Sequence, residues 1–510
     1  MARLLISAAH KSSGKTTLSI GLCAALAAQG LHVQPFKKGP DYIDPMWLGQ
    51  AAGRPCYNLD PYLMTPEQIR ALFAQHAAHA DISIVEGNKG LYDGLALDGS
   101  NSNAALAHLL DLPVVLVIDA RGMTRGIAPL ILGYQAFDRK VRIAGVILNQ
   151  LGGSRHEAKL RAVIEHYTDV RVLGAVAHEA ALSMTERHLG LMPTLERADS
   201  AEFIRTLGER VAAQVDLQRV LDVARSAAPL SVAPPSAPAP AANLFVRAEP
   251  PALSAVKGAE ASATAALRQA QGERKERVRI GIARDKAFGF YYPDDLAALA
   301  TAGAELVPFD TLQDKALPEV DGLFIGGGFP EVFMQELQAN AALRGRIASA
   351  IEAGMPVYAE CGGLMYLAQS LSWRGQTCRM VGAIPGDVTM HDKPVGRGYV
   401  NLVATPDAPW PGQHRPEAQE QRGHEFHYSS LDNVPADTRF AWRVTRGHGV
   451  DGRHDGIVHR NVLASYAHLR SLGTDGWAGQ FVEFVRSQGT TPRRHASAAG
   501  SSAQRAGAAA

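Results

Sequence analysis

The chain of 510 residues is 46% hydrophobic and 20% charged, which is long and apolar enough for two or three domains with cores of their own. Its formal net charge of +1 excludes the global basic field that attracts nucleic acid or anionic membranes. The four cysteines are too dispersed for a disulfide framework, and no apolar run suits a signal peptide or a membrane span. We therefore expect a cytoplasmic protein that binds neither nucleic acid nor membrane.

Strand-like runs alternate with helical stretches in the first part of the chain. Apolar runs such as RLLISAA, DISIVEG, LPVVLVIDA, IAGVILN and VLGAVA are separated by helical stretches such as TTLSIGLCAALAAQG. Continuous apolar strands between helices are typical of a parallel sheet that is covered on both faces. Residues 1–224 are therefore predicted to form a doubly wound α/β domain.

The segment AHKSSGKTT, residues 9–17, follows the first predicted strand and opens the first helix. The phosphate-binding pattern G-x-x-x-x-G-K-[ST] would place glycine at position 9, where this chain has Ala9, but the second half of the pattern is intact. Backbone N–H groups at a helix N-terminus, a lysine and a hydroxyl are the groups that hold Mg·ATP. We expect an ATP site rather than an ordinary capped helix, formed by Ser13, Gly14, Lys15, Thr16 and Thr17.

Carboxylates suited to magnesium follow two of the strands. Glu86 ends the strand in DISIVEG, while Asp41 and Asp44 lie in the Gly/Pro-punctuated loop KKGPDYIDP. Each alone is equally explained as a solvated loop residue, but with the phosphate loop they indicate a Mg·ATP and substrate site. Asn149 ends the strand IAGVILN and could contact an adenine edge, although an asparagine there is as often a plain turn residue.

The composition changes sharply at about residue 225. Residues 225–276 are rich in Ala, Pro and Ser without apolar periodicity, which predicts a flexible linker, and residues 489–510 are predicted to be a disordered tail for the same reason. Between them, strands such as RVRIGIARD, DGLFIGGG and MPVYAEC again alternate with helices. Residues 277–488 are thus predicted to be a second domain, and the fold class is α/β with two doubly wound parallel-sheet domains.

Cys361 lies at a predicted strand-to-helix turn in MPVYAECGGLMYL. This is nucleophile-elbow geometry, in which the helix N-terminus favours the thiolate and the N–H of Gly362 can face an oxyanion. The loop LFIGGGFPE can bring a second N–H, from Gly327 or Gly328, to the same place. A buried structural cysteine would not explain glycines in both loops, so we predict acyl transfer from an amide through Cys361.

A cysteine nucleophile needs a histidine, and spacing alone does not choose among those between residues 391 and 468. His468 directly follows the strand-like VLASY and could be delivered to the elbow, whereas His459 would lie at the other end of that strand. His424 and His427 form an H-x-x-H pair, but no cysteine or acidic ligand accompanies them at zinc spacing, so zinc is not expected.

With both motifs on the same chain, the sequence resembles the cobyrinic acid a,c-diamide synthase family of corrinoid biosynthesis. That family joins a domain related to dethiobiotin synthetase to a class I glutamine amidotransferase domain of the cobyric-acid-synthase type. The resemblance covers nearly everything except linker and tail, and its most specific stretches are GPDYIDP, DKAFGFYYPDDL and GHEFHYS. It implies that Cys361 and His468 release ammonia from glutamine, and that ATP phosphorylates the c and then the a acetate of a corrin ring for amidation.

The resemblance also assigns roles to the residues of the first domain. Lys15 and Thr16 hold phosphates and Mg²⁺, Asp41 and Glu86 complete the Mg²⁺ site, and Asn149 contacts adenine. The corrinoid, glutamine and ATP are the implied substrates, Mg²⁺ is the implied cofactor, and a homodimer is left open. The residues implied to face the corrinoid carboxylates or the acyl phosphate are Tyr42, Asp44 and Asp93.

The chain departs from the family pattern in four respects. Ala9 replaces the first loop glycine, Arg470 stands where the family commonly has a second histidine, the linker is unusually long, and no acidic triad member can be named. The alternatives are cobyric acid synthase, a nickel-tetrapyrrole diamide synthase and, from another class, a partitioning-type switch ATPase, against which the elbow cysteine argues. The Ala/Arg/Gly-rich composition favours, by association with aerobic high-GC bacteria, the metal-free ring hydrogenobyrinate over cobyrinate.

Overall fold

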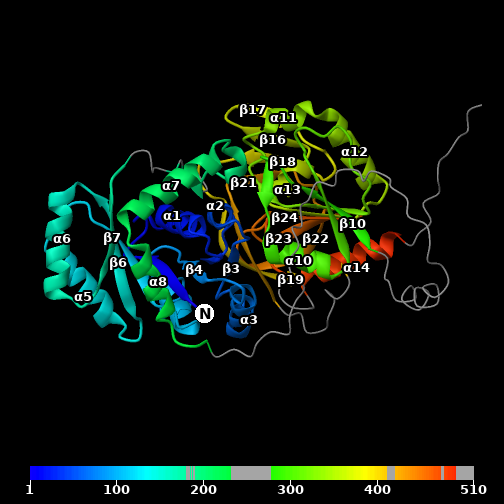
Figure 1. Cartoon of the computed structure of the whole chain (residues 1–510). Helices are drawn as coiled ribbons and strands as arrows, with labels where there is room; N and C mark the ends of the chain where they lie inside the picture. Colours follow the sequence, from blue (N-terminus) through cyan, green and yellow to red (C-terminus); the bar gives the residue numbers. More distant parts are fainter. Residues whose placement is uncertain are drawn as a thin grey trace, which may run out of the picture.

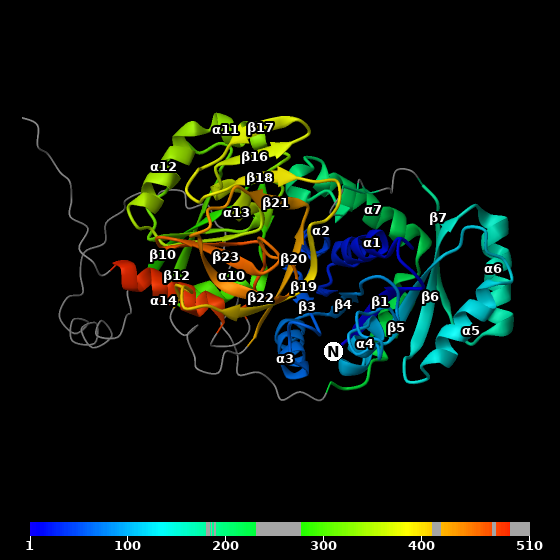
Figure 2. The ribbon, with the colours of Figure 1, turned by 180° about the vertical axis from the view of Figure 1, so that it is seen from behind.

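The computed structural model describes residues 1–179, 184, 186–187, 190–230, 277–410, 420–471 and 476–489. Most of the predicted linker, 225–276, and nearly all of the predicted tail, 489–510, lie outside the described residues. The chain before residue 231 and the chain after residue 276 form two lobes that lie side by side (Figures 1 and 2).

A seven-stranded sheet, in which every neighbouring pair is parallel, is the centre of the N-terminal lobe. Its strand order β3-β2-β4-β1-β5-β6-β7 confirms the doubly wound prediction for this lobe. The strands are β1 (Arg3–Ala8), β2 (Val33–Lys38), β3 (Tyr57–Leu59), β4 (Ile82–Glu86), β5 (Val114–Asp119), β6 (Ile143–Leu151) and β7 (Val172–Ala177).

Successive residues of these strands face opposite cores. Leu4 and Ile6 belong to the core that is formed with α1 (Lys15–Ala28), α2 (Ile43–Ala52), α7 (Ser200–Gln214) and α8 (Leu217–Arg225). Leu5 belongs to the opposite core, formed with α3 (Pro66–Ala77), α4 (Asn103–Leu109), α5 (Ile127–Phe137) and α6 (Ser154–Tyr167). Short elements precede α7: β8 (Glu186–Arg187), β9 (Gly190–Leu191) and η2 (Thr194–Glu196).

The sheet of the C-terminal lobe has nine strands in the order β12-β10-β13-β15-β24-β23-β22-β19-β20. The five strands from β12 to β24 are parallel as predicted, but the remaining four pair antiparallel, so this sheet is mixed. The strands are β10 (Val278–Ala283), β12 (Ala304–Phe309), β13 (Gly322–Ile325), β15 (Val357–Glu360), β19 (Gly396–Ala404), β20 (Gln421–His427), β22 (Arg439–Arg446), β23 (His454–His459) and β24 (Val462–Ser465).

Helices cover both faces of the parallel part of this sheet. One core contains α10 (Pro293–Thr301) and α14 (Trp477–Gly489), and the other contains α11 (Met334–Ala339), α12 (Ala341–Glu352) and α13 (Gly362–Leu367). Two small sheets complete the lobe: β16 (Ser370–Trp373), β17 (Gln376–Arg379), β18 (Asp387–Met390) and β21 (Ser429–Asp432) form one, and β11 (Phe288–Phe290) and β14 (Gly327–Gly328) form the other.

The two lobes are joined by direct polar contacts. The hydroxyl of Tyr399 donates to both oxygens of Asp60 (3.0 and 3.1 Å), and that of Tyr62 donates to Asn401 (2.7 Å). Arg470, the departure noted above, pairs with Asp294 at 2.7 Å and reaches Met64 of the other lobe at 3.4 Å. Arg470 therefore places a buried cation at the junction of the lobes.

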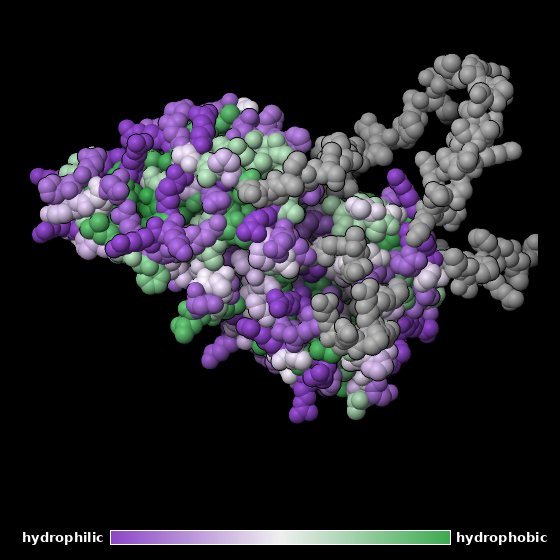
Figure 3. Space-filling model, turned by 90° about the horizontal axis from the view of Figure 1, so that it is seen from below, coloured by the Kyte–Doolittle hydropathy of each residue, from purple (hydrophilic) through white to green (hydrophobic). Residues whose placement is uncertain are grey.

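Within the described ranges, no helix is both long and apolar enough to cross a bilayer. On the face seen in Figure 3, hydrophilic residues predominate and hydrophobic ones are scattered among them.

Candidate active sites

The first site lies where β1 leads into α1. Gly14 has φ 82°, and a Cβ there would overlap Nδ2 of Asn149, so only glycine fits. Lys15, the first residue of α1, is only 8% exposed. The backbone N–H of Ala9 donates to Val117 (3.2 Å), which continues the pairing of β1 with β5 and lets an alanine take this position.

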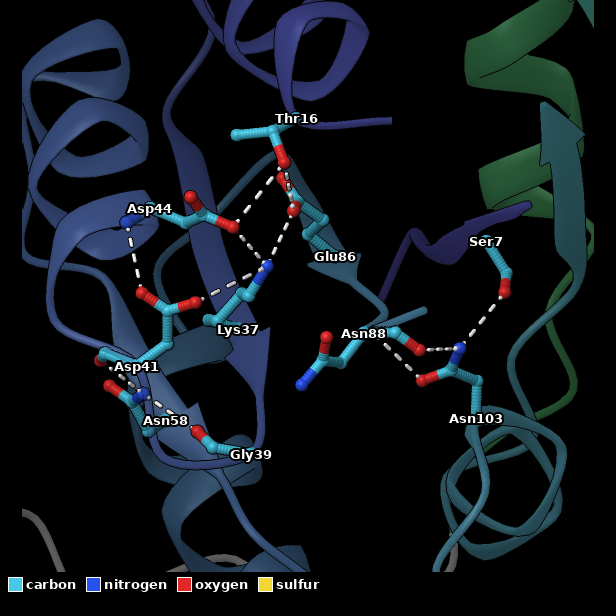
Figure 4. A network of polar contacts seen from close by, with 10 residues as sticks. All are labelled: Ser7, Thr16, Lys37, Gly39, Asp41, Asp44, Asn58, Glu86, Asn88 and Asn103. Atoms are coloured by element: carbon cyan, nitrogen blue, oxygen red, sulfur yellow. Dashed lines mark hydrogen bonds and ion pairs between the residues drawn. The ribbon is translucent and has the colours of Figure 1, made fainter. Parts of the chain in front are cut away.

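Three carboxylates converge on one lysine beside Thr16, as Figure 4 shows. The Lys37 ammonium lies 2.6 Å from Glu86 and 3.8 Å from Asp41, and it pairs with Asp44 as well. The hydroxyl of Thr16 donates to Glu86 (2.9 Å) and to Asp44 (3.3 Å). Of the predicted magnesium residues, Thr16 lies at the start of α1, Asp41 in the loop between β2 and α2, and Glu86 at the end of β4, all around Lys37.

Burial and neighbouring charges set the ionisation of this cluster. Burial, together with the Asp44 charge, raises the pKa of Asp41 to about 7. Burial by itself would lower the pKa of Lys37, but the charges of Asp44, Glu86 and Asp41 hold it well above its ordinary value. Glu86 is fully buried, and within the described chain its Oε2 has no hydrogen-bond partner. An unpaired buried carboxylate oxygen beside a threonine hydroxyl fits a hard cation such as Mg²⁺.

Lys37 was not predicted from the sequence. A lysine at the end of a strand is normally solvated, and here it becomes buried because β2 pairs with β4 and sets Lys37 opposite Glu86. The only signal was a pair of lysines, Lys37 and Lys38, at the end of the strand-like run HVQPF. That signal acquires meaning only when the strand order is known.

Other predicted residues lie apart from this cluster. Asn149 donates its side-chain N–H to the carbonyl of Ser13 (2.9 Å). This side chain, which was expected to contact adenine, therefore supports the phosphate loop in the structure. Asp93 accepts from the backbone N–H of Gly90 (2.9 Å) within its own loop. Asn103 ties this loop to β1 through Ser7 (3.1 Å), a contact that Figure 4 also shows. The half-buried Thr17 follows Thr16 in the first turn of α1.

The second site is an elbow between β15 and α13. Cys361 occupies the turn with φ 48° and ψ −101°, an uncommon backbone conformation for a residue other than glycine. A Cβ on Gly363 would overlap the carbonyl of Ile325, and one on Gly362 would lie 2.9 Å from the nitrogen of Gly328. The elbow and the glycine loop therefore pack backbone against backbone, which explains why both contain glycines.

His468 is the histidine that lies beside Cys361. Nδ1 of His468 lies 3.2 Å from Oε2 of Glu360, and the Cys361 thiol is near enough to raise the pKa of the imidazole. Burial by itself would lower the pKa of His468, but the hydrogen bonds and charges of Cys361 and Glu360 outweigh it and raise the pKa to about 10. His459 lies at the other end of β24 and pairs with Glu352 (3.3 Å).

Glu360 is the acidic neighbour that the sequence did not identify. Its side chain is buried, and Oε1 accepts from the N–H of Leu469 (3.0 Å) and the hydroxyl of Tyr358 (2.5 Å), which leaves Oε2 for His468. The residue immediately before a nucleophile gives no signal of such a role. It becomes evident only from the pairing of β15 with β24, after which the chain turns back to His468.

Tyr42 lies between the two sites. It is 8% exposed and precedes α2, and its ring centroid lies 5.2 Å from that of His468 in the other lobe. The residue predicted to face the substrate is thus packed against the elbow histidine in this structure.

Two family models match the two lobes separately. An AAA domain matches residues 2–186, and a CobB/CobQ-like glutamine amidotransferase domain matches residues 279–475. The chain is 46% identical over 488 residues to the cobyrinate a,c-diamide synthase of Magnetococcus marinus, covering 96% of this chain and 98% of that protein. It is 42% identical to the enzyme of the same name from Methanosarcina acetivorans, covering 94% and 95%. With such identity over nearly the whole of both chains, this chain belongs to the cobyrinate a,c-diamide synthase family.

Proposed function

We propose that the chain amidates the a and c acetate side chains of a corrin ring, with ATP and glutamine, through acyl-phosphate intermediates. The observation that carries the proposal lies at the lobe junction, where the ring of His468, beside Glu360, packs against the ring of Tyr42. Tyr42 comes directly after Asp41, one of the carboxylates clustered on Lys37. A carboxylate is a poor acyl donor, because its leaving group would be oxide or hydroxide. Phosphorylation supplies a good leaving group, and a dry route keeps ammonia unprotonated.

In the glutaminase half-reaction, the Cys361 sulfur attacks the amide carbon of glutamine and His468 gives a proton to the departing ammonia. Glu360 holds the imidazolium in place through Nδ1. The N–H of Gly362, with that of Gly327 or Gly328, faces the oxyanion. Water then hydrolyses the thioester, which releases glutamate and restores the thiol.

In the synthetase half-reaction, Ser13, Gly14, Lys15 and Thr17 are assigned to the nucleotide phosphates. Asn149, expected at the adenine, supports the phosphate loop through the carbonyl of Ser13. Mg²⁺, when bound to Thr16, Asp41 and Glu86, would neutralise phosphate charge. Asp44, Asp93 and Tyr42 are assigned to the corrinoid side of the site. The acetate oxygen takes the γ-phosphoryl group and ADP leaves; ammonia then displaces phosphate from the acyl carbon to give the amide.

The names of the relatives also bear on whether the corrin ring that is amidated contains cobalt. Relatives at 46% and 42% identity are named for cobyrinate, which supports the cobalt-containing ring over the metal-free ring that the composition favoured.

The use of ATP and glutamine supports a cytoplasmic location. A homodimer stays a prediction, which light scattering of the purified protein would test.

Mass spectrometry of the product tests the proposal. Purified protein would be incubated with Mg·ATP, glutamine and either cobyrinate or hydrogenobyrinate. We expect two successive mass changes, each equal to the replacement of OH by NH₂, and faster consumption of cobyrinate. Unchanged rings would contradict the proposal, and ATP hydrolysis that responded to DNA or a protein instead would favour the switch ATPase.

A further inference from the structure

Lys38, the last residue of β2, is a buried cation without a partner in the described part of the chain. Its side chain is only 8% exposed, yet it forms no hydrogen bond and no ion pair with any described residue. Burial accordingly lowers the pKa of Lys38 below its ordinary value. Buried charges in proteins are normally paired, so a buried lysine that is left unpaired indicates a partner from outside the chain.

Lys38 lies on the other side of β2 from the magnesium cluster. Successive residues of a strand point to opposite faces, and Lys37 is in register with Glu86 of β4 whereas Lys38 is in register with Leu59 of β3. The charge that acts most strongly on Lys38 is that of Asp60, the residue after Leu59. The ammonium of Lys38 therefore lies at the carboxyl edge of the sheet, toward the loop that follows β3.

The carboxylates that attract Lys38 are already engaged elsewhere. Asp60 accepts from the backbone N–H of Tyr62 (2.8 Å) and, with both oxygens, from the hydroxyl of Tyr399 (3.0 and 3.1 Å). Asp93 accepts a backbone N–H within its own loop (2.9 Å). Neither forms an ion pair with Lys38, so the ammonium stays available to an anion that arrives with a ligand.

A second polar group lies beside the loop that follows Lys38. Asn103 fixes the backbone of Asn88, since it donates to the carbonyl (2.8 Å) and accepts from the N–H (2.9 Å). The side-chain amide of Asn88 has no partner among the residues of Figure 4, and a Cβ on Gly39 would lie 3.7 Å from its Nδ2. The exposed Lys89 adds a second positive charge near Lys38. Ammonium and amide N–H groups of this kind are donors that suit a carboxylate.

The proposed substrate brings more than one carboxylate to this site. While one acetate of the ring takes the γ-phosphoryl group, the other carboxylates remain anions and need a cation in surroundings that include Asp93. Lys15 is assigned to the nucleotide phosphates, and Lys37 is neutralised by three carboxylates of the chain itself. Lys38 is the buried lysine of this edge that is left to receive one.

We propose that Lys38 binds a carboxylate of the corrin ring other than the one that is being phosphorylated, and so positions the ring. The inference rests on the proposed function, because it takes the corrinoid as the ligand. It predicts that the charge of Lys38 sets the affinity for the corrinoid and leaves the reaction of the bound substrate unchanged. An ammonium binds phosphate as well as carboxylate, so both ligands have to be measured.

Lys38→Met keeps the length of the side chain and removes its charge. Because one charge-assisted hydrogen bond is lost, we expect the Kd for cobyrinate, measured by calorimetric titration of the full-length protein without ATP, to rise about tenfold to 100-fold. The KM for the corrinoid should rise in parallel, while kcat and the KM for ATP stay unchanged. Equal Kd values in the two proteins would overturn the proposal, as would a raised KM for ATP alone, which would assign Lys38 to phosphate.

The free energy of unfolding separates this role from a structural one. An unpaired buried charge costs stability, so ligand-free Lys38→Met should be at least as stable as the wild type in urea, and a loss of stability would overturn the proposal. Lys140→Met is the matched control, because the exposed Lys140 precedes β6 and lies at the opposite edge of the same sheet. Equal weakening of corrinoid binding in Lys140→Met would show that net charge alone is responsible, and would also overturn it.

Titration with the a,c-diamide of the ring identifies the carboxylate. A loss of affinity confined to cobyrinate would place the waiting acetate at Lys38, and a loss shared with the a,c-diamide would place another side-chain carboxylate there. Both results support the proposal. If the wild type binds cobyrinate but amidates neither ring, the proposed function fails, while the difference in Kd still decides the role of Lys38.

Discussion

Glu360 sets the state of the histidine beside it. The carboxylate is buried, and two of its hydrogen bonds come from groups that hold it in place, the N–H of Leu469 and the hydroxyl of Tyr358. Its remaining oxygen faces His468 at 3.2 Å. A buried anion fixed in this way favours the imidazolium, which is the form that donates a proton to ammonia.

Glu360→Gln preserves the size of the side chain and removes the anion. We expect glutamine hydrolysis to slow by about 100-fold, as when a catalytic histidine loses its acidic partner, while synthesis from ammonium salts is unchanged. Glu352→Gln is the matched control, because Glu352 pairs with His459 at the far end of β24. Equal rates of glutamate release in the wild type and Glu360→Gln would show that Cys361 and His468 suffice for glutamine hydrolysis without the carboxylate.

The same histidine predicts a pH dependence of stability. Its pKa is raised from 6.5 to about 10 in the folded protein. The folded state therefore binds this proton more tightly than the unfolded chain, and the resulting stability is complete below pH about 6.5 and lost as the pH rises toward about 10. The free energy of unfolding of the wild type should fall over this range, relative to His468→Gln, by at least about 1 kcal/mol in urea titrations. If the free energy of unfolding depended on pH in the same way in both proteins, His468 would not be the source of the pH dependence.

Single residues also show what the sequence could reveal. Cys361, His468, Thr16 and Glu86 were predicted because each belongs to a local pattern or ends a strand. Lys37 and Glu360 were not, because their roles depend on which strands become neighbours, β2 with β4 and β15 with β24. Local patterns carry no information about such pairings.

At the scale of elements, the elbow depends on the close approach of two loops. Gly363→Ala would drive a Cβ into the carbonyl of Ile325, a backbone atom that cannot step aside. We expect a loss of glutaminase activity and a destabilisation of about 3 kcal/mol, measured by chemical unfolding. In Gly345→Ala, on α12, the added Cβ meets no atom within 4 Å, so the same substitution should stabilise the helix by about 0.5–1 kcal/mol. Similar effects of both substitutions would refute the packing argument.

The C-terminal sheet shows which strands could not be predicted from the sequence. Buried apolar runs between helices led correctly to the parallel strands β10, β13 and β15. The antiparallel strands β19, β20, β22 and β23 carry polar and apolar residues in mixed order, since part of each is half-buried or exposed. Such strands lack the continuous apolar signature, so the prediction of a wholly parallel sheet was wrong for this half.

At the scale of the whole molecule, Arg470 is a buried cation at the junction of the two lobes. Its side chain is 1% exposed and pairs with Asp294, while its far end reaches Met64 of the other lobe. Arg470→Met would leave the Asp294 charge without its partner, and we expect a destabilisation of about 3 kcal/mol in urea unfolding. Adding Asp294→Asn should restore part of the loss. If the single and double variants were equally unstable, the loss of the Arg470–Asp294 ion pair would not be the cause of the destabilisation.

Cys361 is only 7% exposed, beneath a junction that both lobes build. A thiolate in water reacts with peroxide and disulfides, and beyond the sulfenic acid its oxidation is irreversible. Burial in the folded protein therefore also preserves the enzyme, because reagents reach this sulfur far less readily than an exposed thiol. Oxidation of Cys361 should accelerate when the protein unfolds, so a stable fold would also mean a longer-lived nucleophile.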